Sequence, residues 1–303
     1  MKFPQNYLDE DAWTIECPEI MSLKEKIESK GVLIKNLKKW DIEIFRGLLT
    51  GYNEAFVIDT PTKNQICLED RNSLDIIKPI IRGRDIDRYH HRWSDLWIIN
   101  AHNGYLENGT RIPPINVKQD YPAVYRFLFD KDKETGGKVK KRFDQGKHWT
   151  NLRNCAFMEH FKGEKILWIE LTNTNKFCYS SNEEYILAGA FLMTGKCLKY
   201  LLAFLNSKLC KFYFNLISNS SGMATVQWKK FALERMPIND ISIEQQKPFI
   251  ELVDKILHIT KDDAYVGKQA KIGKLEKEID QLIYNLYELT PDEISIVENF
   301  NEK

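Results

Sequence analysis

The spacing of hydrophobic residues changes after about residue 171, and this change limits the folds that the chain can adopt. Up to that point, short apolar runs such as residues 97–99 and 165–171 alternate with segments rich in glycine and proline, which is typical of β-strands joined by loops. Beyond it, apolar residues recur every three or four positions, which predicts an amphipathic helix with the stripe Leu198, Leu201, Leu202, Leu205, Leu209 and Phe212. The order of the two patterns predicts an α+β fold, with a mixed, bent β-sheet and packed helices over residues 40–240, followed by a helical C-terminal appendage.

Pro237 separates the predicted sheet region from a purely helical one. Two helical stripes follow it, one from Phe249 to Leu257 and one from Ile272 to Leu286, and they predict a pair of packed helices. The sequence therefore predicts two parts: residues 1–239, which include a short N-terminal lead-in, and a helical spacer or tail over residues 240–303.

Four shorter segments carry local signals. The charge-rich stretch 20–30 predicts a short helix, and Pro122 predicts the first turn of another. Gly47–Gly51 predicts a turn between two strands, of which residues 55–58 are the second. The charged segment 130–141 contains two adjacent glycines and predicts a mobile loop or a hairpin tip.

The composition is that of a soluble globular protein. The 303 residues, of which 43% are hydrophobic, are enough for a sizeable core. No apolar run approaches the roughly 20 residues of a membrane span, and the N-terminus lacks the apolar core of a signal peptide. The six cysteines are scattered, which is typical of reduced thiols. We therefore expect a cytoplasmic protein.

The net charge is only +1, but the charges are unevenly distributed along the chain. Residues 78–165 contain 18 Lys and Arg against 11 Asp and Glu, together with five of the six histidines. Residues 240–303 contain 8 basic against 14 acidic side chains. A basic middle and an acidic tail predict that one surface faces a polyanion, and segregation of charge by chance is the alternative.

The segment Ile77–Tyr89 carries three arginines, Arg82, Arg84 and Arg88, around one glycine. A guanidinium group is a planar fork that suits phosphate oxygens and guanine edges. The alternative is a surface turn in which these arginines pair with the neighbouring carboxylates of the same segment.

The familiar catalytic and cofactor motifs are not found in the sequence. There is no glycine-rich phosphate or dinucleotide loop, no Gly-x-Ser-x-Gly elbow and no His-Glu-x-x-His metal site. A metal-dependent nuclease could recruit Asp144, Glu164 and Glu170, but their spacing matches no nuclease pattern. The one Pro-Pro pair, in Ile112–Ile115, lacks the flanking polar and aromatic residues of the loop that holds a flipped adenine. We expect no catalytic residue, no metal and no cofactor in this chain.

Four segments, taken in order, carry a resemblance to a known family. They contain a Gly-x-x-Thr-Gly-x-Asn-Glu-Ala-Phe entry, an Arg-Gly-x-Asp-Ile element, a central part, and a helix with an exit strand. The segments are Gly47–Asp59, Ile80–Tyr89, Arg142–Arg153 with Lys165–Trp168, and Leu201–Leu209 with Leu233–Ile238. On these residues the chain resembles the TaqI-like C-terminal specificity domain of type IIG restriction-modification enzymes and adenine-specific DNA methyltransferases.

The resemblance implies that residues 1–239 form a target recognition domain, which reads a short sequence in double-stranded DNA. A separate adenine methyltransferase domain or subunit, placed N-terminal to this region or acting in trans, would perform the chemistry. The chain would then be a fragment of a larger enzyme or a free-standing specificity subunit. Residues 240–303 are similar to the spacer helices of type I specificity subunits. Protein–protein interaction through these C-terminal helices is the alternative function.

The resemblance and the chemistry of the side chains together predict the residues that contact DNA. Phosphate contacts are expected from the cations Arg82, Arg84, Arg88, Lys138, Lys140, Lys141 and Lys147. Base contacts are expected from side chains with forks, amides or rings, namely Arg142, His148, Asn151 and Arg153.

Some polar residues in the same segments are expected to serve the fold. For Arg142, a structural role with Asp144 and Trp149 is an equal alternative to base reading. Turn formation is the expected role of Gly47, Gly51 and Asn53. Fixing the helix against the sheet is the expected role of Asn206 and Ser207.

Overall fold

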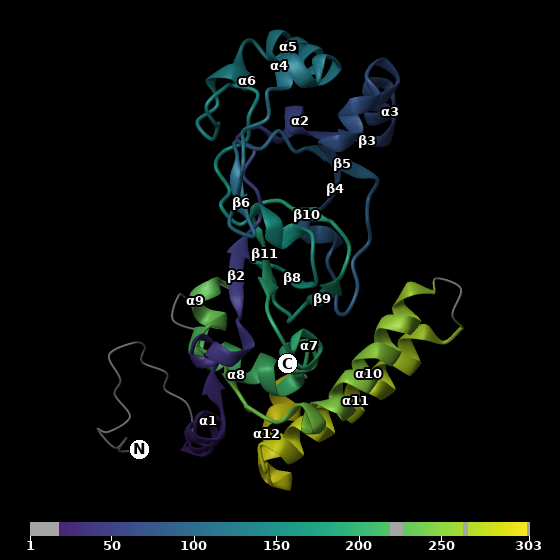
Figure 1. Cartoon of the computed structure of the whole chain (residues 1–303). Helices are drawn as coiled ribbons and strands as arrows, with labels where there is room; N and C mark the ends of the chain where they lie inside the picture. The colour runs from purple at the N-terminus through teal and green to yellow at the C-terminus, as the bar shows by residue number, and fades with distance from the viewer. Residues whose placement is uncertain (1–17, 219–226, 263–265, 302–303) are drawn as a thin grey trace.

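The computed structural model describes residues 18–218, 227–262 and 266–301, and these residues form an α+β fold (Figure 1). The strands are β1 (Val32–Leu33), β2 (Glu43–Arg46), β3 (Val57–Asp59), β4 (Ile77–Ile81), β5 (Leu96–Ile99), β6 (Tyr105–Glu107), β7 (Thr110–Ile112), β8 (Lys165–Ile169), β9 (Phe177–Ser180), β10 (Tyr185–Ile186), β11 (Ala190–Thr194) and β12 (Pro237–Ile238). The helices are α1 (Pro18–Lys30), α2 (Asn53–Phe56), α3 (Thr60–Glu69), α4 (Val117–Asp120), α5 (Pro122–Glu134), α6 (Lys138–Lys141), α7 (Leu198–Leu205), α8 (Lys208–Ser218), α9 (Lys230–Leu233), α10 (Ile243–Lys261), α11 (Lys268–Leu286) and α12 (Pro291–Asn301).

The strands are distributed over several small sheets. Two sheets have four strands, in the orders β2-β11-β8-β9 and β10-β4-β5-β3, and two have two strands, β1-β12 and β6-β7. Among the described strands, β10 and β4 pair in parallel, whereas the other pairs are antiparallel. This arrangement confirms the predicted α+β class and differs from the parallel, doubly wound sheet of nucleotide-binding enzymes.

The β2-β11-β8-β9 sheet is the layer that joins two hydrophobic cores. Successive side chains of a strand point to opposite faces of its sheet. In β8, Ile166 and Trp168 therefore enter one core, while Leu167 enters the other. In β11, Met193 likewise enters the first of these cores and Leu192 the second. Separation of the two cores would expose a whole face of this sheet, so the layer holds the two halves of the molecule together.

Helices build the first core on one face of that sheet. The stripe predicted for residues 198–212 enters this core from α7 and α8, and α10, α11 and α12 pack against these two helices (Figure 1). Tyr287, just after α11, is fully buried, and its hydroxyl donates a hydrogen bond to the carbonyl of Pro237 at 2.6 Å. The C-terminal helices thus share a core with the central helices, and the division of the chain at residue 239 stays a prediction.

The second core lies between the other four-stranded sheet and the small helices α2 to α6, at the top of Figure 1. The β10-β4-β5-β3 sheet supplies Ile80, Ile81, Ile98 and Ile99, all of them fully buried. This half of the molecule carries the basic middle of the sequence, and it lies at the opposite end of the molecule from the start of α12 in Figure 1.

Several local predictions are confirmed and two are wrong. Helix α1 covers the predicted segment 20–30, and α5 begins at Pro122. The segment 47–51 lies between β2 and β3, but the predicted second strand at residues 55–58 is wrong at its start, because residues 53–56 are helical, and the two strands belong to different sheets. Residues 130–141 are not a mobile tip either, because the end of α5 and the whole of α6 occupy them.

The single helix predicted from the stripe between Leu198 and Phe212 is broken into α7 and α8 at Asn206 and Ser207. The side chain of Asn206 exchanges two hydrogen bonds with the backbone of Phe177, at 2.9 and 3.1 Å. Asn175 donates in turn to the carbonyls of Leu205 and Ser207. These bonds satisfy backbone groups that the break leaves without helical partners, so Asn206 fixes the helices against the sheet as the sequence predicts.

Candidate nucleic-acid interface

The centre of the basic segment is a buried arginine. Arg142 is 5% exposed, and its guanidinium donates hydrogen bonds to five backbone carbonyls, those of Thr50, Val139, Asp144, Trp149 and Asn151. Burial lowers the pKa of Arg142 to about 10, which leaves the side chain cationic at neutral pH. Because the side chain is buried and both Nε and Nη1 donate to carbonyls, the structure favours the structural alternative for Arg142.

The same carbonyls hold the loop at residues 143–151 against the turn that follows β2. Gly51 lies beneath this loop with φ +71°, and a Cβ there would meet the carbonyl oxygen of Asp144 at 2.8 Å. Beside it, the hydroxyl of Thr50 donates to Asn53 Oδ1 at 2.6 Å. Gly51 and Asn53 thus form a turn, as predicted, and glycine is required because it tolerates both the conformation and the close approach.

Asn151 is the second predicted base reader that the structure reassigns. It is 2% exposed, and its amide nitrogen donates to the carbonyl of Ile115 at 2.8 Å. A buried side chain whose amide already bonds the backbone cannot reach a base edge. Asn151 joins the loop to the segment before α4, and it belongs to the scaffold of the interface.

Several other side chains in and beside the loop are exposed, whereas Thr150 is buried. Phe143 is 95% exposed, and Lys147 and His148 are exposed beside it. Arg153 is about half exposed and forms an ion pair with Asp144 at 2.8 Å. Burial lowers the pKa of His148 and nearby Lys118 lowers it further, so its ring is neutral at physiological pH.

The lysines of α6 divide into two kinds. Lys138 and Lys141 are exposed. Lys140 instead forms an ion pair with the buried side chain of Asp132 at 3.2 Å, and its ammonium lies 5.0 Å from the centre of the Trp149 ring. Val139 is fully buried between them and anchors the helix. Lys138 and Lys141 are therefore available to a ligand, whereas Lys140 mainly serves the fold.

The sequence arguments missed three exposed residues around this loop. Arg111, on β7, lines with Lys147 a cavity of about 470 Å³ at the base of the β6-β7 hairpin. Lys118, on α4, lies close enough to His148 to lower its pKa. Phe143 follows Arg142 directly, and the run of basic residues before an aromatic one is the signal that could have indicated it. We call the exposed cations here the basic surface, which comprises Arg111, Lys118, Lys138, Lys141, Lys147 and Arg153.

The three arginines of the segment 77–89 lie elsewhere. Arg82 forms a bidentate ion pair with Asp85, in which Nε and Nη2 lie 2.8 and 2.9 Å from the two carboxylate oxygens. Arg88 bonds Glu276 of α11, Asn175 and the carbonyl of Asn206. Intramolecular partners thus engage the guanidinium groups of both Arg82 and Arg88, and the phosphate contacts at these two residues stay predictions.

Arg84 alone of these three arginines is exposed. It lies in the turn Gly83–Asp85, which packs against β8, and the following residues from Asp87 to Trp93 line a cavity against α10 and α11. Lys147, by contrast, lines the cavity at the base of the β6-β7 hairpin.

A buried charged network lies near Arg88 and carries a testable pH dependence. Glu184 is 8% exposed and accepts hydrogen bonds from His91 at 3.1 Å and Ser180 at 2.6 Å. Burial raises the pKa of Glu184, but its hydrogen bonds with His91, Ser180 and Asn182 outweigh burial and bring the pKa down to about 2. The ordinary value is 4.5, so the folded state holds this carboxylate ionised where the unfolded chain would protonate it.

We expect this carboxylate to contribute on the order of 3 kcal/mol of stability that is fully present above pH 4.5 and is lost as the pH falls toward 2. Urea unfolding between pH 5 and 2 measures the loss. Glu184→Gln cannot titrate and should flatten the dependence over this window. Equal slopes for the two proteins would show that other carboxylates govern acid unfolding.

Comparison with models of known protein families identifies the family of this chain. The TaqI-like C-terminal specificity domain matches residues 78–238, which is more than half of the chain. The chain belongs to this family. The matched region runs from β4 to β12 and contains the whole basic surface. No curated protein matches the chain at a significant level.

Two solved restriction enzymes share the fold of this TaqI-like specificity domain protein. The type IIG restriction endonuclease BpuSI aligns with a TM-score of 0.52 and 13% identity, over 89% of this chain and 33% of that enzyme. The type IIL restriction-modification enzyme MmeI, solved in complex with DNA, aligns with a TM-score of 0.56 and 11% identity, over 86% of this chain and 35% of that enzyme. The chain thus spans about one third of the length of each enzyme.

The described part of this TaqI-like specificity domain protein contains no helix that is long and apolar enough to cross a membrane. The same residues contain no group of three or more His, Cys, Asp or Glu side chains placed to hold a metal ion.

Proposed function

We propose that this chain reads a short sequence of double-stranded DNA as the specificity part of a restriction-modification enzyme, and that the basic surface faces the duplex. Family membership supports DNA target recognition, and the similar fold of MmeI, solved with DNA, supports a role on duplex DNA. Residues 1–239 would form the recognition domain and residues 240–303 the helical spacer. The methyl transfer or cleavage would belong to an adenine methyltransferase or nuclease module in the same longer polypeptide or in another subunit.

The loop at residues 143–151, whose base is held by Arg142, is the observation that supports the basic surface as the DNA-binding surface. Arg142 donates hydrogen bonds to five carbonyls at the base of this loop, while Phe143, Lys147 and His148 are exposed. Rigid side chains lose little entropy on binding, so such a loop suits recognition in a groove. Lys138, Lys141 and Lys147 are the phosphate contacts in this proposal, and sequence is read by the side chains between them.

Arg153 and Phe143 are the base readers in this proposal. The guanidinium of Arg153 pairs with Asp144 through one nitrogen at 2.8 Å, and its remaining donors can form a fork to guanine O6 and N7. The ring of Phe143 supplies an apolar contact of the kind that recognises a thymine methyl group. His148, which is neutral, can donate to or accept from a base edge.

Selection from a randomised duplex library at low ionic strength tests the proposal, because the Debye length is then long and weak binding is retained. We expect the unchanged chain to enrich one short sequence. Arg153→Ala should weaken binding to that sequence by roughly 1–3 kcal/mol and leave binding to unrelated duplexes almost unchanged. Binding with no enriched sequence would reject sequence reading, and an equal loss on all duplexes would make Arg153 a phosphate contact.

Protein–protein interaction through the C-terminal helices remains the second candidate function. The stripes of α10 and α11 that motivate it are buried in the core of this chain, as Val253, Ile256, Ile279 and Ile283 show with 0 to 1% exposure. A partner would therefore have to bind the polar faces of these helices. A stable complex with a protein partner, together with no DNA affinity at low salt, would favour this alternative.

A further inference from the structure

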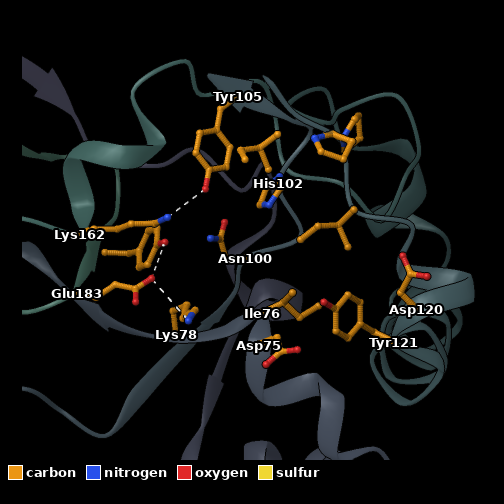
Figure 2. Close-up of a pocket in the computed structure, with 15 residues that line it drawn as sticks. Asp75, Ile76, Lys78, Asn100, His102, Tyr105, Asp120, Tyr121, Lys162 and Glu183 are labelled. Atoms are coloured by element: carbon orange, nitrogen blue, oxygen red, sulfur yellow. Dashed lines mark hydrogen bonds and ion pairs between the residues drawn. The ribbon is translucent and has the colours of Figure 1, made fainter. Parts of the chain in front are cut away.

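A cavity of about 480 Å³ opens between the edge of the β10-β4-β5-β3 sheet and the base of the β6-β7 hairpin (Figure 2). The cavity is separate from the side chains assigned to DNA contact above. Its wall includes one amide and several rings, namely Asn100, His102, Tyr105, Tyr121 and Tyr185. Its size falls within the range of about 300–1,000 Å³ that is usual for small-molecule sites.

Asn100 carries the one buried polar atom of this wall that is left without a hydrogen bond among the described residues. It follows β5 directly and is 5% exposed, and its Oδ1 atom has no hydrogen-bond partner. Its backbone is held firmly, since its N–H donates to Ile76 and its carbonyl accepts from His102. Figure 2 shows Asn100 in the middle of the wall, below Tyr105 and beside His102. A buried amide oxygen without a partner is destabilising, and a ligand that donates a hydrogen bond to it would relieve this cost.

Lys78, Tyr105, Lys162, Glu183 and Tyr185 on this wall have partners among the described residues. Lys162 forms an ion pair with Glu107 and donates to the hydroxyl of Tyr105 at 3.4 Å. The hydroxyl of Tyr185 donates to Glu183 at 3.2 Å, and Lys78 pairs with the same carboxylate at 3.6 Å. Asn100 differs from the other polar groups on this wall because its unpaired atom is buried.

The charge of the wall disfavours an anion. Lys78 and Lys162 face the carboxylates of Asp75, Asp120 and Glu183, which leaves one net negative charge. Burial lowers the pKa of His102 and Lys162 lowers it further, so this ring adds no positive charge at neutral pH. The wall therefore disfavours an anion, and a phosphate group would be repelled.

We propose that this cavity binds a neutral nucleobase, which Asn100 holds through paired hydrogen bonds. A side-chain amide presents a donor and an acceptor side by side, which is the pattern on the edges of nucleobases. The rings of His102 and Tyr105 meet edge to face at 5.0 Å and provide the aromatic surface beside the amide. The base can come from a free nucleoside or from a nucleotide extruded from a duplex, and the chemistry of recognition is the same for both.

Titration of the whole chain with each of the four neutral deoxynucleosides, followed by calorimetry, tests the proposal without duplex DNA. We expect at least one nucleoside to bind, deoxyribose alone not to bind, and Asn100→Leu to weaken nucleoside binding at least 10-fold. Asn64→Leu, the same change at an exposed position of α3, is the matched control and should bind as the unchanged chain does. The thermal midpoint of Asn100→Leu should not fall, because leucine has no unsatisfied acceptor. If Asn100→Leu fails to fold, Asn100→Asp, which keeps the shape and removes the donors, takes its place.

A duplex that carries 2-aminopurine separates the two sources of the base. A rise in fluorescence that Asn100→Leu abolishes identifies an extruded base, and nucleoside binding without such a rise identifies a free nucleoside. Absence of nucleoside binding at millimolar concentration, or equal binding by the unchanged and Asn100 variant chains, would overturn the proposal. Because nucleoside binding is measured without DNA, this result is independent of whether the basic surface binds a duplex.

Discussion

Reversal of three charges on the basic surface should almost abolish DNA binding. The variant Lys138→Glu, Lys141→Glu, Lys147→Glu removes three exposed cations, and each phosphate that a cation neutralises releases a condensed counterion. We expect the affinity at 50 mM salt to fall on the order of 100-fold on every duplex, and the salt slope to decrease by about 2.7, which is 0.9 for each of three phosphates. Titration of labelled duplexes from 50 to 200 mM salt measures both quantities.

Lys140 is left unchanged in this variant for a structural reason. A glutamate at that position would lie beside the buried carboxylate of Asp132 and would destabilise the fold itself. The control is the triple reversal of Lys247, Lys255 and Lys277, which are exposed on α10 and α11 and carry the same total charge. We expect the control to retain most of the affinity. If both triple variants lose affinity equally, the effect is one of net charge and the basic surface is not the interface.

Truncation of Arg142 should produce the largest loss of stability in this region. Arg142→Ala removes hydrogen bonds to five backbone carbonyls, of which that of Asn151 still accepts from the N–H of Gly146, and it removes a charged side chain that lies 4.4 Å from the ring centre of Phe56. Hydrogen bonds to charged groups are worth more than neutral ones, so we expect a loss on the order of 4 kcal/mol. Arg142→Lys should be nearly as damaging, because an ammonium has three donors and no planar fork. Urea unfolding measures both.

Two further measurements test whether Arg142 stabilises the loop at residues 143–151 in particular or the fold in general. Arg153→Ala, at the exposed end of the same loop, should cost less than about 1 kcal/mol, since surface ion pairs contribute little. Amide hydrogen exchange should accelerate at residues 143–152 in Arg142→Ala before it changes in β8 or β11. A stability within 1 kcal/mol of the unchanged chain, with the same exchange rates, would show that these carbonyls do not depend on Arg142.

Residue type predicted which segment carries the candidate interface, but it did not predict which side chains of that segment are available. Arg142 and Arg153 have the same side chain and lie 11 positions apart, yet one is buried among carbonyls and the other is half exposed. Availability depends on whether intramolecular acceptors surround the guanidinium, and those acceptors come from residues as distant as Thr50. Arg88 shows the same dependence, because its partner Glu276 lies 188 positions away.

The sequence by itself determined the α+β class, the helical stripes and the family, because periodicity and motif order are local properties that survive without knowledge of the packing. Helix α5 at Pro122 and strand β8 follow directly from such local signals. Tertiary structure alone decided that β2 and β3 join different sheets, that α6 replaces a mobile tip, and that Asn100 keeps an unpaired oxygen beside a cavity. These features depend on hydrogen-bond partners and burial contributed by distant parts of the chain, which no local spacing records.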